Sequence, residues 1–200
     1  YQLRITDKNG QFIKELLPVD PKSKVLHGLG QNFYVYDGKL NVFPHFSNTI
    51  FSITPDSTTQ RYHFYFGDYH FPDDEIFQKK EYNSQAIMSE IMNNSYVRLM
   101  APYETDEHLL VKYYVKRQVL LGIYNKKKHT AINLDPEMVI DSLHLGTFPV
   151  PIGFNHNEFI GQLTLDIQQK NRIMIPELQK LMADYSEDSN PILIFYSLRS

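Results

Sequence analysis

The sequence of 200 residues contains neither cysteine nor tryptophan. Without cysteine the chain can form no disulfide, and it has no thiolate to act as a nucleophile or a metal ligand. This absence fits a reducing cytosol or a bacterial envelope protein that does not depend on disulfides. The formal net charge is only −3 at pH 7, which gives no electrostatic reason to expect nucleic acid as a partner. We therefore predict no nucleic-acid partner, and we expect no cofactor.

Long apolar runs are also missing. No stretch approaches the roughly 20 apolar residues that a membrane-spanning helix needs, so we predict no transmembrane segment. No signal peptide is visible, but the chain begins at Tyr1 without an initiator methionine. Because Tyr1 also lies inside a predicted strand, we expect the natural N-terminus further upstream, and the missing targeting segment is uninformative.

Aromatic residues are abundant, with 14 tyrosines and 13 phenylalanines, and such residues favour half-buried strands over helices. Residues 1–6 alternate between apolar and polar, which is the period of a strand with one buried face. The turn residues Asp7-Lys8-Asn9-Gly10 follow, and residues 11–17 alternate again. This pattern predicts a β-hairpin.

Three further groups of strands follow, and the turns within each group are short. The expected strands are 32–36, 39–43, 49–54 and 61–66 in the second group, 96–101, 109–115, 120–124 and 130–134 in the third, and 150–154, 159–167 and 192–198 in the fourth. Apolar residues at helical spacing predict a helix over 176–185 and a weaker one over 83–92. We expect both helices to be insertions that cover a sheet edge or rim.

Four-stranded groups that recur every 45–60 residues or so are typical of β-propeller blades. We therefore predict an all-β chain of about three and a half blades, at approximately 1–20, 30–67, 96–135 and 150–200. A β-sandwich or jelly roll remains open, because short strands with regular turns also build those folds. The propeller is favoured because a Greek key would need at least one long return between sheets.

Three segments carry a resemblance to a known family: residues 48–53, residues 62–67 with Pro72, and residues 190–196 after the helix that begins at Pro176. The chain resembles the C-terminal part of the six-bladed β-propeller proteins of Bacteroides-type bacteria, many of them predicted lipoproteins of unknown function. The resemblance implies the fold and a cell-envelope location, either periplasmic or as an outer-membrane lipoprotein. It transfers no catalytic residues. Because six blades need roughly 300 residues or more, we expect missing blades or a second chain to complete the ring.

Long loops on a propeller face are the expected place for a site. The propeller hypothesis places His45, the insertion 68–94 and the loop 136–149 around one entrance. We predict His45, Asp68 and His70 as ligand-binding residues. A metal site is a weaker hypothesis, because the histidines lack the compact spacing of a zinc motif. His63, which alternates with its neighbours on a predicted strand, is expected to pack on the sheet.

Three polar segments could carry other chemistry. Residues 104–108 and 155–158 combine carboxylates with histidine, as general acid–base catalysis would require. Both are predicted hairpin turns, however, where polar residues are expected anyway. The basic segment 126–129 is interpreted as a solvated turn, and the acidic run 73–75 as a charged loop or helix N-terminus. We therefore predict no catalytic residues.

The leading functional hypothesis is a non-enzymatic binding module of the bacterial envelope, which presents a propeller face to a glycan, a peptide or an envelope protein. The alternative is a propeller-type hydrolase or lyase with a metal in the central channel, whose ligands the absent blades would hold. A purely structural partner in an envelope complex fits the sequence equally well.

Overall fold

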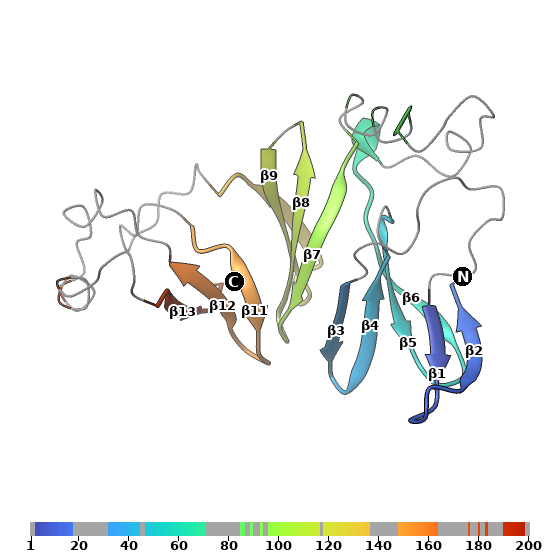
Figure 1. The fold of residues 1–200 in the computed structure, drawn as a ribbon. Coiled ribbons are helices and arrows are strands. Elements are labelled where there is room, and N and C mark those ends of the chain that lie inside the picture. Colours follow the sequence, from blue (N-terminus) through green and yellow to red (C-terminus); the bar gives the residue numbers. More distant parts are fainter. Residues whose placement is uncertain are drawn as a thin grey trace. The chain divides into compact units, whose positions relative to one another are not determined.

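The computed structural model of the chain describes most residues of its strands and turns. The described residues are 3–17, 32–44, 47–70, 96–116, 118–136, 148–163 and 190–198, with the single positions 85, 86, 89, 93, 176, 180 and 183. The structure is built mostly of antiparallel strands (Figure 1), as predicted. Among the described residues, no helix has both the length and the hydropathy that crossing a bilayer requires.

The strands form four sheets, which agree with the four predicted groups. The first sheet is the hairpin of β1 (Leu3–Thr6) and β2 (Phe12–Leu16), and the second has the order β3-β4-β5-β6, with β3 (Asn32–Tyr36), β4 (Lys39–Phe43), β5 (Thr49–Ile53) and β6 (Thr58–His63). The third has the order β10-β9-β8-β7, with β7 (Arg98–Glu104), β8 (His108–Val115), β9 (Gln118–Asn125) and β10 (Thr130–Leu134). The fourth has the order β11-β12-β13, with β11 (Pro151–Phe154), β12 (Phe159–Leu163) and β13 (Ile192–Tyr196). No described sheet closes on itself.

Two predicted strands are displaced along the chain. The strand predicted at 61–66 is observed as β6 at Thr58–His63, and its pairing with β5 runs from Ile53↔Thr58 to Thr49↔His63. Because β5 begins at Thr49, residues beyond Phe64 have no strand to pair with and leave the sheet. The strand predicted at 96–101 is observed as β7, which continues to Glu104. It ends there because the following turn begins at Thr105, whose N–H donates to the His108 carbonyl at 2.8 Å.

The predicted helical segments are described only at single positions. Gln85, Ala86, Ser89 and Asn93 are helical, as are Pro176, Lys180 and Ala183. A short 3₁₀ turn, η1 (Gly67–Tyr69), follows β6 and was not predicted. The continuation predicted for β12 beyond Leu163 lies outside the described residues.

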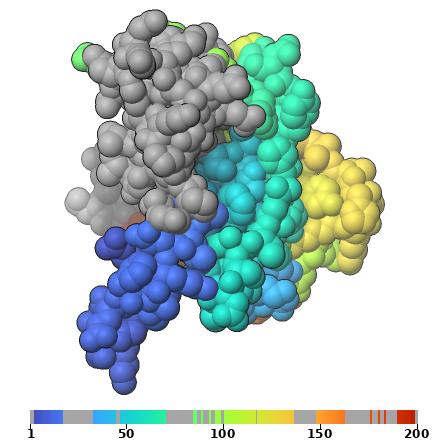
Figure 2. Space-filling model, turned by 90° about the vertical axis from the view of Figure 1, so that its right-hand side faces the viewer, coloured from blue at the N-terminus to red at the C-terminus, as the bar shows by residue number. Residues whose placement is uncertain are grey.

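The chain divides into two compact units, residues 1–101 with 113–118 and residues 102–112 with 119–200. In the first unit the hairpin β1–β2 packs on the β3–β6 sheet, against which it lies in Figure 2. Leu3, Leu16 and Leu17 contact a core that includes Val42 and Ile53. The chain thus covers an apolar sheet face with a second sheet, which removes that face from water.

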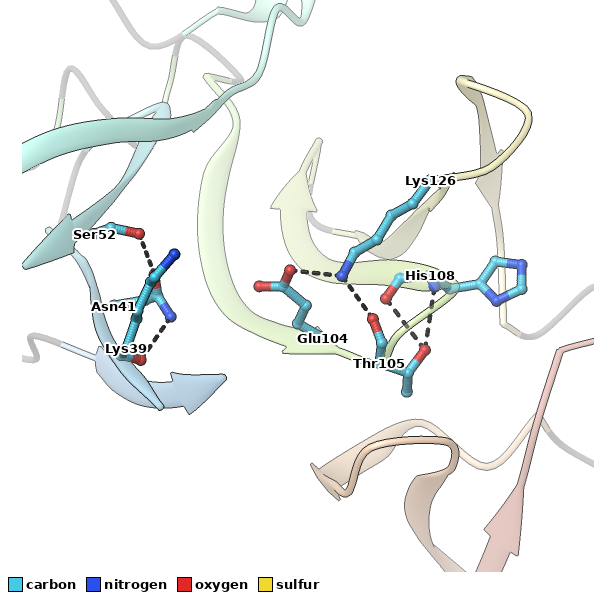
Figure 3. A network of polar contacts seen from close by, with 7 residues as sticks. All are labelled: Lys39, Asn41, Ser52, Glu104, Thr105, His108 and Lys126. Carbon is cyan, nitrogen blue, oxygen red and sulfur yellow. Dashed lines mark hydrogen bonds and ion pairs between the residues drawn. The ribbon is translucent and has the colours of Figure 1, made fainter. Parts of the chain in front are cut away.

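One buried polar pair lies within the β3–β6 sheet. Asn41, which is fully buried, accepts a hydrogen bond from the Ser52 hydroxyl at 2.7 Å and donates to the Lys39 carbonyl at 3.1 Å (Figure 3). Asn41 and Ser52 are directly paired across β4 and β5. Because a buried amide without partners is costly, this contact favours one register of the two strands.

The core of the second unit is centred on Leu110, Leu121 and Phe159. β12 approaches the segment before β11 closely: a Cβ at Gly161 would lie 2.8 Å from the Pro149 Cβ. The Tyr196 hydroxyl donates a 2.7 Å hydrogen bond to the Pro149 carbonyl. Burial raises the pKa of Tyr196, so this hydroxyl stays a protonated donor.

Candidate functional site

Five side chains at one end of the β3–β6 sheet form a cluster that we call the imidazole patch: Asn48, Thr49, His63, Tyr65 and His70. Asn48 and Thr49 lie at the start of β5, and His63 ends β6. Tyr65 and His70 belong to the segment that follows β6. The segment lies at the surface in Figure 2, and Tyr65 is 81% exposed.

Hydrogen bonds hold both imidazole rings. The Nδ1 atom of His63 lies 2.8 Å from the Thr49 hydroxyl, and the Nε2 atom of His70 lies 3.0 Å from the Asn48 Nδ2 atom. The two ring centroids are 5.7 Å apart, and the Tyr65 ring lies 5.6 Å from that of His70. The patch therefore combines two fixed polar rings with one exposed aromatic ring.

Val97, Tyr113 and Lys116 hold the segment that follows β6. Phe66 packs on the buried Tyr113 of β8, with ring centroids 5.2 Å apart, and the Tyr69 carbonyl accepts a 2.8 Å hydrogen bond from Val97. Lys116 lies 4.2 Å above the Tyr69 ring and also donates to its hydroxyl. Gly67 has a φ of +57°, which glycine adopts without steric cost, and it starts the turn that leads to His70.

Of the three predicted ligand-binding residues, the structure brings only His70 into the patch. His45 lies outside the described residues. Asp68 is exposed in η1, and the hydrogen bonds and ring contacts that define the patch do not involve it. His70 lies in the patch, where its contact with Asn48 joins the β4–β5 connection to the segment after β6, two of the connections expected around one entrance. The third, the loop 136–149, lies largely outside the described residues, as does the acidic run 73–75.

Sequence reasoning missed Asn48 and Tyr65 and assigned His63 to the sheet surface. His63 ends β6, where its exposed ring bonds to Thr49, the residue paired with it across β5 and β6. Tyr65 was counted as part of a strand. Tyr65 is exposed because β6 ends at His63. The aromatic run 62–66 instead predicts a strand that continues to residue 66.

A second polar cluster lies in the other unit, where three hairpin turns meet. We call it the turn junction; it consists of residues 104–108, 125–129 and 155–158. The Asp106 N–H donates to the His156 carbonyl at 2.8 Å, and the Lys126 N–H donates to the Glu107 carbonyl at 2.8 Å. The three segments that the sequence predicts as separate turns are therefore bonded to one another.

The turn junction contains a buried ion pair. The Glu104 side chain is fully buried, and its carboxylate lies 2.7 Å from the Lys126 ammonium. Figure 3 shows the same ammonium reaching the Thr105 carbonyl, at 2.6 Å. Glu104, which the sequence assigns to a hairpin turn, is thus the buried last residue of β7. The interpretation of residues 126–129 as a solvated turn is wrong for Lys126, whose side chain is only 17% exposed.

His108 is also buried in the turn junction, with 5% of its surface exposed. Its Nε2 atom lies 3.1 Å from the Asn125 Nδ2 atom. Burial, and less strongly the nearby Lys126 and Lys127, hold the pKa of His108 below its usual value. Lys127 also pairs with Glu107, and this contact lowers the pKa of the Glu107 carboxyl. Within the described residues, no three histidine or acidic side chains lie together as a metal site would require.

Comparison with known proteins gives a fold and a family. The chain is similar to a crystal structure from Bacteroides fragilis whose title calls it a "Putative exported protein", with a TM-score of 0.77 and 19% sequence identity. The similarity covers 98% of this chain but only 57% of that one. No curated protein matches the sequence. A family model described as a domain of unknown function, DUF4934, matches residues 1–197, and the chain belongs to this family.

Proposed function

We propose that the protein is a non-enzymatic binding module of the bacterial cell envelope, and that the imidazole patch binds a glycan. The observation that carries the proposal is Tyr65, a large aromatic ring 81% exposed beside two imidazoles held in place by hydrogen bonds. The envelope location is supported by the similar Bacteroides structure, whose title describes an exported protein. It is also the location that the sequence resemblance implies.

The chemistry of the patch suits a sugar better than a strongly charged ligand. A sugar ring has an apolar face, which can lie on an exposed tyrosine ring, and hydroxyls that can bond to the Nε2 atom of the exposed His63. The nitrogens of His70 serve the patch itself, because Nε2 contacts Asn48 and Nδ1 is buried. The rings of His63 and His70 are held before any ligand arrives, so that binding would cost little additional side-chain entropy. Lys116, which lies over the ring of Tyr69, the residue before His70, is already bonded to the Tyr69 hydroxyl.

Replacing Tyr65 with alanine is expected to weaken glycan binding about tenfold, because the stacking surface of the site is lost. The measurement is a glycan array of neutral and acidic saccharides, followed by titration calorimetry with the strongest hit. Phe12→Ala is the matched control, because Phe12 is 59% exposed on β2 and lies outside the patch. It should leave the affinity unchanged.

Two outcomes would contradict the proposal. A glycan array without signal above background would exclude a glycan ligand. An equal loss of affinity in Tyr65→Ala and Phe12→Ala would show that the ligand does not bind at the patch. If the protein bound only a peptide array, it would still be a binding module, but its ligand would be a peptide and not a glycan.

We also propose that the sheets are blades of a six-bladed β-propeller, at approximately 1–20, 30–67, 96–135 and 150–200, and that further blades or a second chain complete the ring. The order of strands within each sheet supports this arrangement, since neighbours in sequence are neighbours in the sheet. So does the greater length of the similar structure. The fourth sheet has three described strands and exposes Ile152, Leu193 and Phe195, which a neighbouring blade would cover.

If a ring is completed, the natural product has a mass in solution well above the 23.5 kDa of this chain. Sedimentation equilibrium of the protein purified from its source measures the mass in solution, and intact mass spectrometry measures the mass of one chain. Together they distinguish a longer chain from an assembly of several chains. A monomer of 23.5 kDa with Phe195 accessible to chemical labelling would contradict the proposal.

A further inference from the structure

The orientation of the Asn125 side-chain amide in the turn junction is fixed by the backbone. Its Oδ1 atom accepts hydrogen bonds from the Lys127 N–H at 3.0 Å and the Lys128 N–H at 2.8 Å. Turning the amide over would bring its NH₂ group against two backbone donors and lose both bonds. The Oδ1 atom therefore faces the turn, and the Nδ2 atom is the one that faces His108.

This orientation determines the protonation state of His108. The Asn125 Nδ2 atom carries only donors, so the His108 Nε2 atom, 3.1 Å away, must be the acceptor. The ring is then neutral, with its proton on Nδ1. A proton added at Nε2 would place two donors face to face in a site where His108 is only 5% exposed.

The charges that act on the ring come from two of the turns, 104–108 and 125–129. Glu107 is the acidic neighbour that would favour the charged ring, and Lys126 and Lys127 oppose it. Glu104 is already paired with Lys126, and Glu107 with Lys127. From the third turn, His156 contributes a backbone carbonyl that Asp106 bonds. Among the contacts of His108 in the described residues, the Nε2 atom faces the Asn125 amide and no carboxylate that could accept a hydrogen bond from a protonated Nε2.

We propose that the turn junction is a proton-sensitive clasp, closed while the His108 imidazole is neutral and released when it takes up a proton. The folded state holds His108 neutral below the pH of about 6.5 at which a free histidine titrates. In that range the unfolded or opened state binds more protons, so the stability of the junction falls as the pH falls. Release separates the turn 104–108 from the turn 125–129.

Amide hydrogen exchange measured by NMR tests the clasp on the folded chain at pH 7.5 and pH 5. The reporter is the Lys126 amide, whose hydrogen bond to Glu107 joins the two turns. We expect its protection factor, corrected for the intrinsic rate at each pH, to fall about tenfold at pH 5, as the loss of one buried hydrogen bond predicts. The amides of the β3–β6 sheet should keep their protection.

Two variants make the test specific. Asn125→Asp keeps an acceptor for the Lys127 and Lys128 amides but places a carboxylate oxygen at His108, so the pH dependence should reverse. His129→Gln, which changes an exposed histidine in the same turn, should leave the wild-type response intact. Imidazole ¹⁵N shifts that show the proton of His108 on Nε2 at pH 7.5 would overturn the proposal. So would protection at Lys126 that is equal at both pH values, or an Asn125→Asp variant that keeps the wild-type trend.

Discussion

Replacing Lys126 with methionine lowers the free energy of unfolding by about 3–5 kcal/mol, because it leaves the Glu104 carboxylate buried without its cation. The Glu104 side chain is fully buried and lies 2.7 Å from the Lys126 ammonium. Methionine also cannot donate to the Thr105 carbonyl, which now accepts a 2.6 Å hydrogen bond. Urea denaturation followed by circular dichroism at pH 7.5 measures the loss.

The neighbouring ion pair provides the control. Lys127 and Glu107 form a pair on the same two turns, but their side chains are 70% and 43% exposed. Lys127→Met should therefore cost no more than about 1 kcal/mol. The double variant Glu104→Gln with Lys126→Met should recover part of the loss, since it removes the buried charge itself. Equal losses for Lys126→Met and Lys127→Met would show that burial of Glu104 is not what makes the pair important.

Replacing Phe159 with alanine is expected to cost about 3–5 kcal/mol, the range for removing a buried phenylalanine from a core. Phe159 is 1% exposed, packs with Leu110 and Leu121, and lies with its ring centroid 5.7 Å from that of Tyr196. The cavity would open at the centre of the second unit. β12 already lies close to Pro149 at Gly161, and Tyr196 of β13 bonds to the Pro149 carbonyl, which limits how far the site can collapse.

Phe195→Ala is the matched control on the adjacent strand. Phe195 is 54% exposed on this 200-residue chain, and a surface substitution of this kind should change stability by no more than about 0.5 kcal/mol. Both variants are measured by urea denaturation under the same conditions. A loss below about 1 kcal/mol for Phe159→Ala would contradict its place in the core.

Most of the strand pattern could be predicted from the sequence, because period-2 alternation and turn residues act locally. The turn at Asp37-Gly38 is an example: both residues have positive φ, as the tight hairpin between β3 and β4 requires. The strand ends were less predictable, because they depend on the partner strand. Thr58 and Thr59 look like turn residues but pair with β5, whereas Tyr65 looks like a strand residue but lies beyond His63, where the pairing with β5 ends.

The candidate sites depend still more on contacts between distant segments. His70 could be singled out from its place in a long connection, but nothing in the sequence around Asn48 indicates that its amide meets this imidazole 22 residues away. Likewise, Glu104 and Lys126 each lie in a segment with the composition of a solvated turn. Only the packing of the two hairpins decides that the carboxylate loses all contact with water.

The strand order has a consequence for how the chain folds during synthesis. Within the β3–β6 and β7–β10 sheets every strand pairs with the one made just before or after it, so each pairing closes only a short loop at a small cost in chain entropy. Such local contacts favour rapid folding, and each of these sheets can form once its last strand has left the ribosome. The pairing of β12 with β13 differs, because residues 164–191 separate the two strands. This sheet must wait for a longer stretch of translation and is the place where folding of the nascent chain is most easily delayed.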